Sequence, residues 1–230
     1  MKHTSYEARE RFVAMLCDIG AVALPTIKAG LERLEPKLGV PGALTMAEDL
    51  LRAVPEVPDE ELAHVIVRYV KSNVNSLALV ATQALPKAWG VRARPLLLQQ
   101  IHHKNEDVAI EAIKRLRKYG GVDVELLEQL RPIITGSAGS RPNVRHAAVE
   151  ACEDATADAM QRTRTLLVQA MDTLNGTTPD VEDMVVLVSN VIVAVEGDPT
   201  AIALRCRQST PHLRARLEAV LKRAKLPGHG

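Results

Sequence analysis

Apolar side chains recur along most of this 230-residue chain at intervals of three and four positions. Val108, Ala112 and Leu116 fall on one face of a helix at this spacing, and the same pattern returns in residues 144–155 and 213–221. Alternation of apolar and polar residues, which would indicate strands, is scarce. The pattern therefore predicts an all-helical fold in which short turns join amphipathic helices.

Two segments of the chain are near copies of each other. Residues 20–31 and 90–101 share a glycine, an alanine three positions later, a proline five positions later, and a leucine or isoleucine eleven positions later. Glycine suits a left-handed helix end, and a proline in the first turn of the next helix costs no hydrogen bond. Such self-similarity indicates a stack of helical hairpins.

A second motif recurs in residues 76–85, 107–116 and 143–152. Each copy opens on a polar residue expected to cap the helix, continues with an apolar residue, and has an alanine five positions after the cap. Where two helices cross closely, a methyl group allows an approach of the backbones that a larger side chain would block. The motif therefore predicts close helix crossings at equivalent places.

These landmarks resemble those of the HEAT repeat family, including the short repeats of phycobilisome lyases. The resemblance is best over residues 5–37 and 75–155. It implies a right-handed α-solenoid of about five to six helical hairpins, with residues 1–230 forming a single repeat domain. Residues 38–44 and 135–142, rich in small residues and proline, are candidate seams within it.

Polar residues punctuate the expected helix starts. Thr4 and Thr45 are each followed by a glutamate three positions later, as in a capping box, and Thr210 precedes a proline. The longest apolar run, residues 184–195, is well short of the roughly 20 residues that a membrane span needs. We expect it to be a helix covered by its neighbours, with a strand as the alternative, and we expect no membrane-spanning segment.

Composition narrows the class of protein further. Aromatic residues make up 2% of the chain, so the core must consist of aliphatic side chains and few rings can stack on a ligand. The three cysteines lie far apart in apolar runs, which is typical of reduced core residues. The polar amino-terminal stretch does not look like a secretion signal, and we therefore expect a cytoplasmic protein.

The net charge of +1 conceals blocks of opposite sign. Residues 87–145 carry eleven basic and six acidic side chains, whereas residues 146–198 carry two and ten. Residues 199–230 are basic again, with seven against one. Either neighbouring blocks neutralise each other along the stack, or they present a charge-segregated surface to a partner.

Signatures of catalysis are scarce. The sequence has no glycine-rich phosphate loop and no nucleophile elbow. Glu61 and His64 have the spacing of a metal-binding pair, but a second copy is not evident. HEAT-repeat iron hydroxylases carry His-Glu dipeptides, and none of the seven histidines here is followed by glutamate. We expect no cofactor, no metal and no catalytic residue.

We therefore predict a non-catalytic scaffold that binds another protein through a concave face. The repeat family implies that the second helices of successive hairpins line this face. The predicted contact residues are the polar ones on those helices: Lys28, Arg94, Gln99, Gln100, Glu125, Glu128 and Arg131. Homo-association through a terminal repeat is also expected, because an uncapped end exposes apolar surface.

Binding of nucleic acid is the alternative. Some DNA glycosylases that remove alkylated bases are similar in size and in their HEAT-like hairpins, and they use a basic concave face, tryptophans and a carboxylate. A phosphate-binding patch here would consist of Lys87, Arg92, Arg94, Lys114, Arg115, Arg117 and Lys118. The single tryptophan, Trp89, precedes a hairpin turn, where a packing role is the competing interpretation. A bilin lyase remains a third option, although no residue marks a bilin site.

Overall fold

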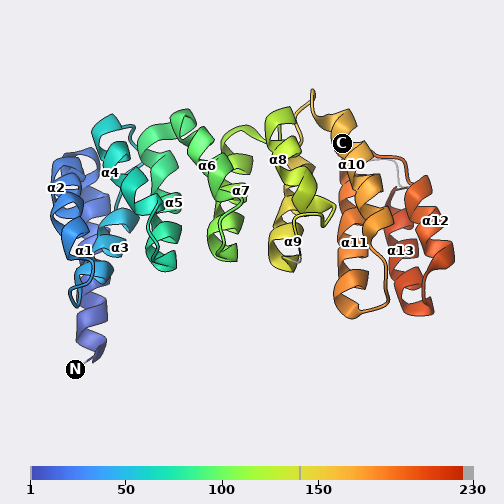
Figure 1. Cartoon of the computed structure of the whole chain (residues 1–230), viewed down its shortest axis with the longest axis horizontal. Helices are drawn as coiled ribbons and strands as arrows, with labels where there is room; N and C mark the ends of the chain where they lie inside the picture. The colour runs from blue at the N-terminus through green and yellow to red at the C-terminus, as the bar shows by residue number, and fades with distance from the viewer. Residues whose placement is uncertain (1, 140, 225–230) are drawn as a thin grey trace. The chain divides into compact units, whose positions relative to one another are not determined.

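The computed structural model describes residues 2–139 and 141–224, and this part of the chain consists of helices joined by short connections (Figure 1). Its first elements are α1 (Lys2–Ile19), η1 (Gly20–Ala23), α2 (Leu24–Leu34), η2 (Glu35–Lys37), α3 (Ala43–Arg52), α4 (Glu60–Val70), α5 (Asn75–Trp89), η3 (Gly90–Ala93), α6 (Arg94–Gln100) and α7 (Glu106–Gly120). The remaining elements are α8 (Val124–Ile134), α9 (Pro142–Ala151), η4 (Cys152–Asp154), α10 (Met160–Thr173), α11 (Pro179–Ala194), α12 (Thr200–Gln208) and α13 (Pro211–Ala224). Elements labelled η are short 3₁₀ turns. The all-helical prediction is confirmed.

The chain divides into two compact units, Met1–Arg115 and Leu116–Gly230. The division falls within α7, whereas the two candidate seams lie elsewhere. Residues 38–44 connect η2 to α3, and residues 135–142 connect α8 to α9. Each unit has its own aliphatic core.

Helices of the first unit pack in two rows. In one row α3 lies between α1 and α5, and in the other α2 packs on α4. Contacts of α2 with α3 and of α4 with α5 join the rows. The Tyr69 hydroxyl in α4 donates a hydrogen bond of 2.5 Å to the Leu31 carbonyl in α2, which ties two helices of the same row together.

The second unit repeats this arrangement. Here α11 lies between α9 and α13 in one row, and α8 packs on α10 in the other. The pairs α8 with α9, α10 with α11, and α12 with α13 join the rows. An isolated parallel bridge between Val122 and Ala155 fastens the turn before α8 to the turn before α10.

The two near-copy segments have the same conformation. Gly20 and Gly90 have φ angles of +62° and +53°, in the left-handed region where a side chain would be strained. Each glycine opens a 3₁₀ turn, and Pro25 and Pro95 lie in the first turn of the helix that follows. The alanine three positions after each glycine is buried in both copies. The two segments, which lie 70 positions apart in the sequence, are therefore equivalent in structure as well.

The spaced alanines are buried as predicted. Ala81, Ala112 and Ala148 are each fully buried, together with the apolar residues four positions before and after them. The run at 184–195 belongs to α11, so the helical interpretation is confirmed for residues 184–194 and the strand alternative is wrong.

Helix starts were predicted less well than helix faces. Thr210 caps α13, because its hydroxyl accepts a hydrogen bond from the Leu213 amide at 3.3 Å. Thr45 does not cap α3, since that helix already begins at Ala43 after Gly42. Asp107 lies inside α7, and the cap there is Asn105, whose side chain accepts from the Val108 amide at 3.1 Å. Several short polar residues near a helix start can each serve as the cap, and the sequence alone does not show which of them does.

One helical stretch, Tyr6–Lys37, is long and apolar enough by length and composition to cross a membrane. The most apolar part has a mean hydropathy of 1.6 and is 17% buried. This feature does not show that the helix spans a membrane, and the absence of a membrane-spanning segment stays a prediction. Core helices of soluble proteins and signal sequences meet the same criterion, so the feature alone is weak evidence about location.

Candidate functional site

In the first unit, charged side chains link α2 to α4. These two helices form one of the two rows described above, the row made of the second helix of each hairpin. Lys28 forms an ion pair with Glu61, and Glu35, the residue that follows α2, forms an ion pair with Arg68 at 3.2 Å. Both pairs join neighbouring hairpins. Lys28, one of the predicted contact residues, thus lies on the expected row, but its charge is matched by a carboxylate of the same protein.

The equivalent row of the second unit holds three of the predicted contact residues. Glu125 and Glu128 are exposed on α8, and Arg131 binds Glu128 through two hydrogen bonds of 3.0 and 3.1 Å. Arg162 of α10 approaches the same carboxylate at 3.9 Å. The hydrogen bond from Arg131 holds the pKa of the Glu128 carboxyl below its usual value. These residues form a small charged cluster across α8 and α10.

The three predicted contact residues of α6 differ in accessibility. Gln99 is exposed and Arg94 is half-buried. Gln100 is only 8% exposed, and its side-chain oxygen is buried with no hydrogen-bond partner among the described residues. The expectation that Gln100 projects from the surface is therefore not met, because the side chain lies on the buried face of its short helix.

Acidic neighbours pair with three of the seven side chains in the proposed phosphate-binding patch. Arg92 pairs with Glu60, and Arg115 donates to Glu111 at 2.6 Å. The remaining paired arginine is Arg117, which contacts two carboxylates, those of Glu153 and Asp154. Of the two lysines on α7, Lys114 is exposed and Lys118 is exposed with its ammonium 5.7 Å from the Tyr119 ring centre. The pairing supports the interpretation that neighbouring charge blocks neutralise each other.

The same holds at the carboxyl-terminal end of the described chain. Arg216 of α13 pairs with Asp183 of α11 at 2.7 Å. Glu182, which is 8% exposed, accepts from the Thr210 hydroxyl at 2.9 Å and lies 3.1 Å from the His212 ring. These contacts hold the pKa of the Glu182 carboxyl below its usual value, the hydrogen bond with His212 contributing most. The basic last helix thus lies against the acidic start of α11.

Several other basic side chains bind the ends of helices. Lys87 donates to the Val54 carbonyl at 3.3 Å, and Arg164 donates to the Val195 carbonyl at 2.7 Å. Arg205 likewise donates to the Leu174 carbonyl. Each contact joins residues 31 or 33 positions apart. A cation at the carboxyl end of a helix satisfies an orphan carbonyl and suits the helix dipole, so these charges stabilise the packing of the helices that they join.

Arg145 on α9 belongs to this group but also faces open space. Its Nε donates to the Ile134 carbonyl at the end of α8 at 2.8 Å, and one Nη donates to the Thr173 hydroxyl of α10 at 2.9 Å. No carboxylate lies within ion-pair distance of it in the described part of the chain. Burial lowers the pKa of this guanidinium, as expected for a half-buried cation without a counter-ion.

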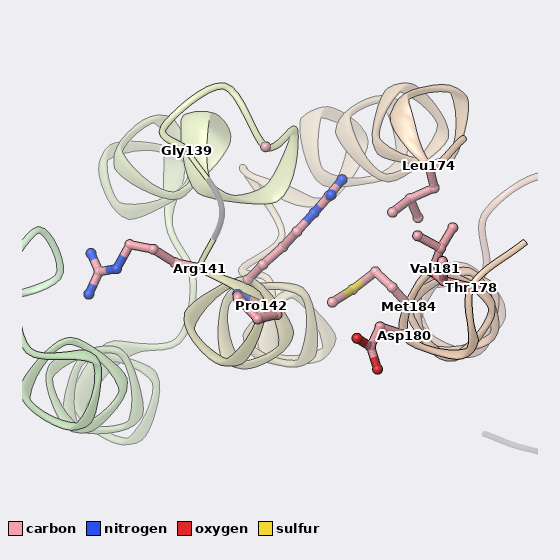
Figure 2. A pocket seen from close by; sticks show the side chains of 10 residues that line it. Gly139, Arg141, Pro142, Leu174, Thr178, Asp180, Val181 and Met184 are labelled. Atoms are coloured by element: carbon pink, nitrogen blue, oxygen red, sulfur yellow. The ribbon is translucent and has the colours of Figure 1, made fainter. Parts of the chain in front are cut away.

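A hollow of about 440 Å³ opens beside this arginine, and we call it the Arg145 hollow (Figure 2). Its lining consists of Gly136, Gly139, Arg141, Pro142, Arg145, Leu174, Thr178, Asp180, Val181 and Met184. Figure 2 shows the side chains of Leu174, Val181 and Met184 close together on one side, and Arg141 directed away from them. The hollow therefore combines an apolar wall with one unpaired cation. Its size is within the range of ligand pockets.

Two helix starts add to the positive potential of the hollow. Arg141 and Thr178 occupy the positions just before α9 and α11, and neither side chain caps its helix. Amides at helix starts carry partial positive charge and attract anions. Asp180 in the first turn of α11 opposes them, but it is exposed to water, where its field is weakened. Gly136 lies close to Arg145, since a methyl group there would be 3.3 Å from the guanidinium.

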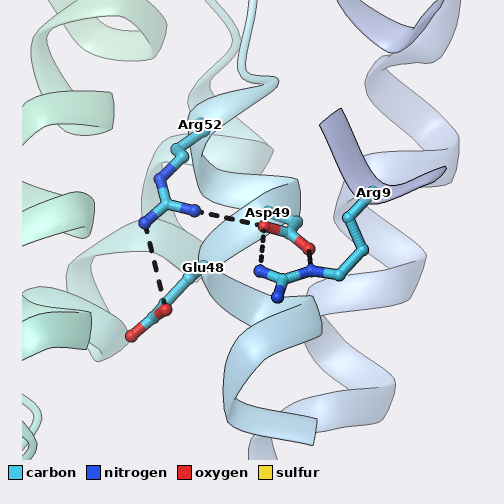
Figure 3. A network of polar contacts seen from close by, with 4 residues as sticks. All are labelled: Arg9, Glu48, Asp49 and Arg52. Atoms are coloured by element: carbon cyan, nitrogen blue, oxygen red, sulfur yellow. Dashed lines mark hydrogen bonds and ion pairs between the residues drawn. The ribbon is translucent and has the colours of Figure 1, made fainter. Parts of the chain in front are cut away.

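Sequence reasoning missed two of these features. The loop before α9 was predicted only as a candidate seam, and Arg145 was not singled out. Only the fold shows that this arginine lacks a carboxylate partner. The second missed feature is the contact of Arg9 with buried Asp49, which joins α1 to α3 (Figure 3).

The residues considered for metal binding and base stacking belong to the first unit, whereas the hollow belongs to the second. Glu61 pairs with Lys28, and His64 packs edge-on against Trp89 with ring centres 5.3 Å apart. Trp89 is thereby held in a packing contact before Gly90. No group of three or more potential metal ligands occurs among the residues that the structure describes.

Neither a protein-family model nor a curated protein matches this sequence.

Proposed function

We propose that this chain is a right-handed α-solenoid of HEAT-like hairpins that acts as a non-catalytic scaffold for another protein. The proposal is supported by contacts that recur at one repeat length. Hydrogen bonds between side chains and neighbouring hairpins join residues 28 to 40 positions apart in both units. A stack of hairpins produces such contacts, because each repeat touches mainly its neighbours.

The Arg145 hollow is the anchor point of this scaffold. The observation that carries the assignment is a half-buried guanidinium without a carboxylate partner beside Leu174, Val181 and Met184. A charged hydrogen bond in a partly desolvated place is stronger than one at an open surface. The hollow thus suits a peptide segment that carries a carboxylate next to an apolar side chain.

The charged cluster of Glu125, Glu128 and Arg131 sets the register of that segment. These side chains are on α8, which leads into the loop that lines the hollow. Exposed charges contribute little affinity individually, but they steer the approach of a partner and exclude wrong ones. Affinity then comes mainly from the anchor in the hollow.

Nucleic acid is the less supported partner. Arg92, Arg115 and Arg117 each contact a carboxylate of the same chain, so phosphates would have to displace these partners. Binding of nucleic acid gains most of its free energy from cations that release counterions from phosphates. Cations already paired with carboxylates contribute less to that term.

Selection of peptides from a displayed random library tests the proposal directly. The account expects enriched peptides with an acidic residue, or a free carboxyl end, next to an apolar residue. Arg145→Gln should weaken the selected peptides at least about tenfold, since a charge-assisted hydrogen bond is lost. Arg164→Gln is the matched control, because Arg164 also holds a helix-end carbonyl but does not line the hollow.

A second variant separates binding from folding. Val181→Glu places a carboxylate at the half-buried edge of the hollow, where it can occupy Arg145 in place of the peptide. Thermal unfolding identifies any variant that fails to fold. The assignment would be refuted if the selected peptides bound Arg145→Gln and Val181→Glu as tightly as they bind the control Arg164→Gln. Saturable binding of a DNA duplex at 150 mM salt, measured by fluorescence anisotropy, would favour the alternative instead.

A further inference from the structure

Helix α1 presents an apolar stripe to solvent. Ala8, Phe12, Met15 and Ile19 follow one another at spacings of four, three and four, which places them on one face of the helix. The exposed fractions of the last three are 39%, 49% and 44%. Leu16 is the only buried side chain of α1 in residues 6–19. The stripe therefore lies beside the face that contacts the rest of the protein, and it is left uncovered.

The stripe continues onto α3. A hollow of about 600 Å³ lies between the two helices, and Ala8, Phe12, Thr45 and Met46 contribute to its lining. Met46 is 54% exposed. Seven of the twelve exposed large apolar side chains in the described residues fall within residues 6–46. Contiguous apolar surface of this kind marks an interaction site more often than isolated exposed residues do.

The spacing of the stripe matches the seam of a two-stranded coiled coil. Residues that repeat at alternating steps of three and four occupy the a and d positions of a heptad, and the neighbouring g positions decide which partner and which direction fit. In this chain the g positions are Arg11 and Asp18. Neither has an ion-pair partner among the described residues. Two opposite charges are thus available on the same side of the seam.

An antiparallel pair of α1 helices satisfies both charges. When Phe12 of one copy packs opposite Met15 of the other, the two-fold axis passes between them and Arg11 of each copy lies opposite Asp18 of the other. A parallel pair would instead place Phe12 opposite Phe12 and leave both charges without partners. The register that packs the apolar stripe is therefore the one that also matches the charges.

We propose that α1 is a homodimerisation helix, which pairs with α1 of a second copy in antiparallel orientation through this seam. The contact is isologous, because the same surface serves both copies. The charges identify the second copy as the occupant, since the stripe and its flanking charges are complementary to themselves. This inference goes beyond the proposed scaffold function and does not depend on it. Two copies would present two Arg145 hollows to a multivalent partner.

The seam covers only two heptads, which predicts a weak dimer. Short interfaces of this size belong to transient associations. In sedimentation velocity, the average mass should rise from the monomer value of 25.0 kDa towards twice that value. We expect the rise over roughly 1 to 300 μM protein, the range of weak association.

Charge reversal tests the pairing. Arg11→Glu places two acidic pairs across the seam, and Asp18→Arg places two basic pairs there. Either single variant should raise the dissociation constant by about tenfold, because two attractive contacts become repulsive. The double variant R11E/D18R restores both pairs with their signs exchanged, and its dissociation constant should return to within about threefold of the wild type.

Two further variants serve as controls. Glu10→Arg reverses an exposed charge on the same helix away from the seam and should leave the dimer unchanged. Phe12→Glu removes the central apolar contact and should abolish dimerisation. These positions are exposed, so circular dichroism should show a folded protein in every case. The variants do not touch Arg145, so peptide binding to the hollow is an independent readout.

Three results would overturn the proposal. The first is a wild-type protein that stays monomeric throughout this concentration range. A second is a dimer that the single reversals leave unchanged, and a third is a double variant that remains as weak as the singles. Cosedimentation of a monomeric wild type with lipid vesicles, lost in Phe12→Glu, would assign the stripe to a membrane surface and also overturn it.

Discussion

Replacement of Arg9 by methionine should loosen α1 from the first unit. Arg9 donates two hydrogen bonds to the Asp49 carboxylate, at 2.7 and 2.9 Å, and Arg52 donates a third at 3.2 Å (Figure 3). The Asp49 side chain is 6% exposed, whereas that of Arg9 is 39% exposed. Methionine keeps the apolar stem of the arginine and removes only the guanidinium. The substitution thus isolates the contact that joins α1 to α3.

The magnitude lies between two limits. Breaking a fully buried ion pair costs about 3–5 kcal/mol, because one charge is left without a partner in the interior. An exposed pair is worth about 0–1 kcal/mol. Asp49 is buried but keeps Arg52, and Arg9 is partly open to water. We therefore expect Arg9→Met to lower the free energy needed to open α1 by about 2 kcal/mol.

Hydrogen exchange measures this loss helix by helix, which matters because stacked repeats need not unfold in one step. A loss of about 2 kcal/mol should make the amides of α1 exchange about 30-fold faster. The amides of α5, whose residues form no hydrogen bond or ion pair with Arg9, should exchange at the wild-type rate. Arg33→Met is the matched control, since Arg33 is exposed on α2 and makes no ion pair in the described residues.

A double-mutant cycle with Asp49→Asn tests the cause. If Arg9 stabilises α1 through Asp49, the amides of α1 in the double variant should exchange about as fast as those in the less stable of the two single variants. The coupling free energy between the two substitutions should then be at least about 1 kcal/mol. Effects that simply add would show that the Arg9 guanidinium stabilises α1 independently of the Asp49 carboxylate, and would refute the reasoning.

Three further predictions concern the hairpins and their contacts. Gly20→Ala and Gly90→Ala should destabilise their turns by similar amounts, about 1 kcal/mol, because both glycines have a positive φ and open space around them. Unequal losses of unfolding free energy, measured with denaturant, would argue against equivalent repeats. Burial raises the pKa of the Cys152 thiol to about 12, so a thiol reagent at pH 8 should label exposed Cys17 first and leave Cys152 unlabelled until the chain unfolds. The pKa of Glu182 is lower in the folded state, so its contribution to stability is fully present above the ordinary glutamate pKa and is lost as the pH falls through the folded value. Urea midpoints measured between pH 7 and 3 should therefore fall less steeply in Glu182→Gln than in the wild type.

Local pattern was sufficient for much of the fold. The glycine and proline landmarks of residues 20–31 and 90–101 predicted two turns that have the same backbone conformation. The spacing of Val108, Ala112 and Leu116 predicted a buried helix face. Both signals arise within one or two turns of chain, where the period of the helix and the strain of a positive φ act directly on the sequence.

Contacts between distant residues could not be predicted in the same way. Asp49 and Arg9 lie 40 positions apart, and nothing in either neighbourhood indicates that one is buried against the other. The neutralisation of the basic patch, for example of Arg117 by Asp154, also depends on the packing of neighbouring hairpins. In hindsight, opposite charges about one repeat length apart are a usable signal. That signal would have moved Lys28 from the predicted binding face to the contacts that join α2 to α4.

The arrangement of the hairpins as a continuous stack is the central claim, and small-angle X-ray scattering tests it most directly. A compact chain of this length has a radius of gyration of about 17 Å. The monomer, kept dilute or carried by the Phe12→Glu variant, should give a clearly larger radius and a pair-distance distribution with a long tail. A radius near 17 Å with a symmetric distribution would contradict the solenoid.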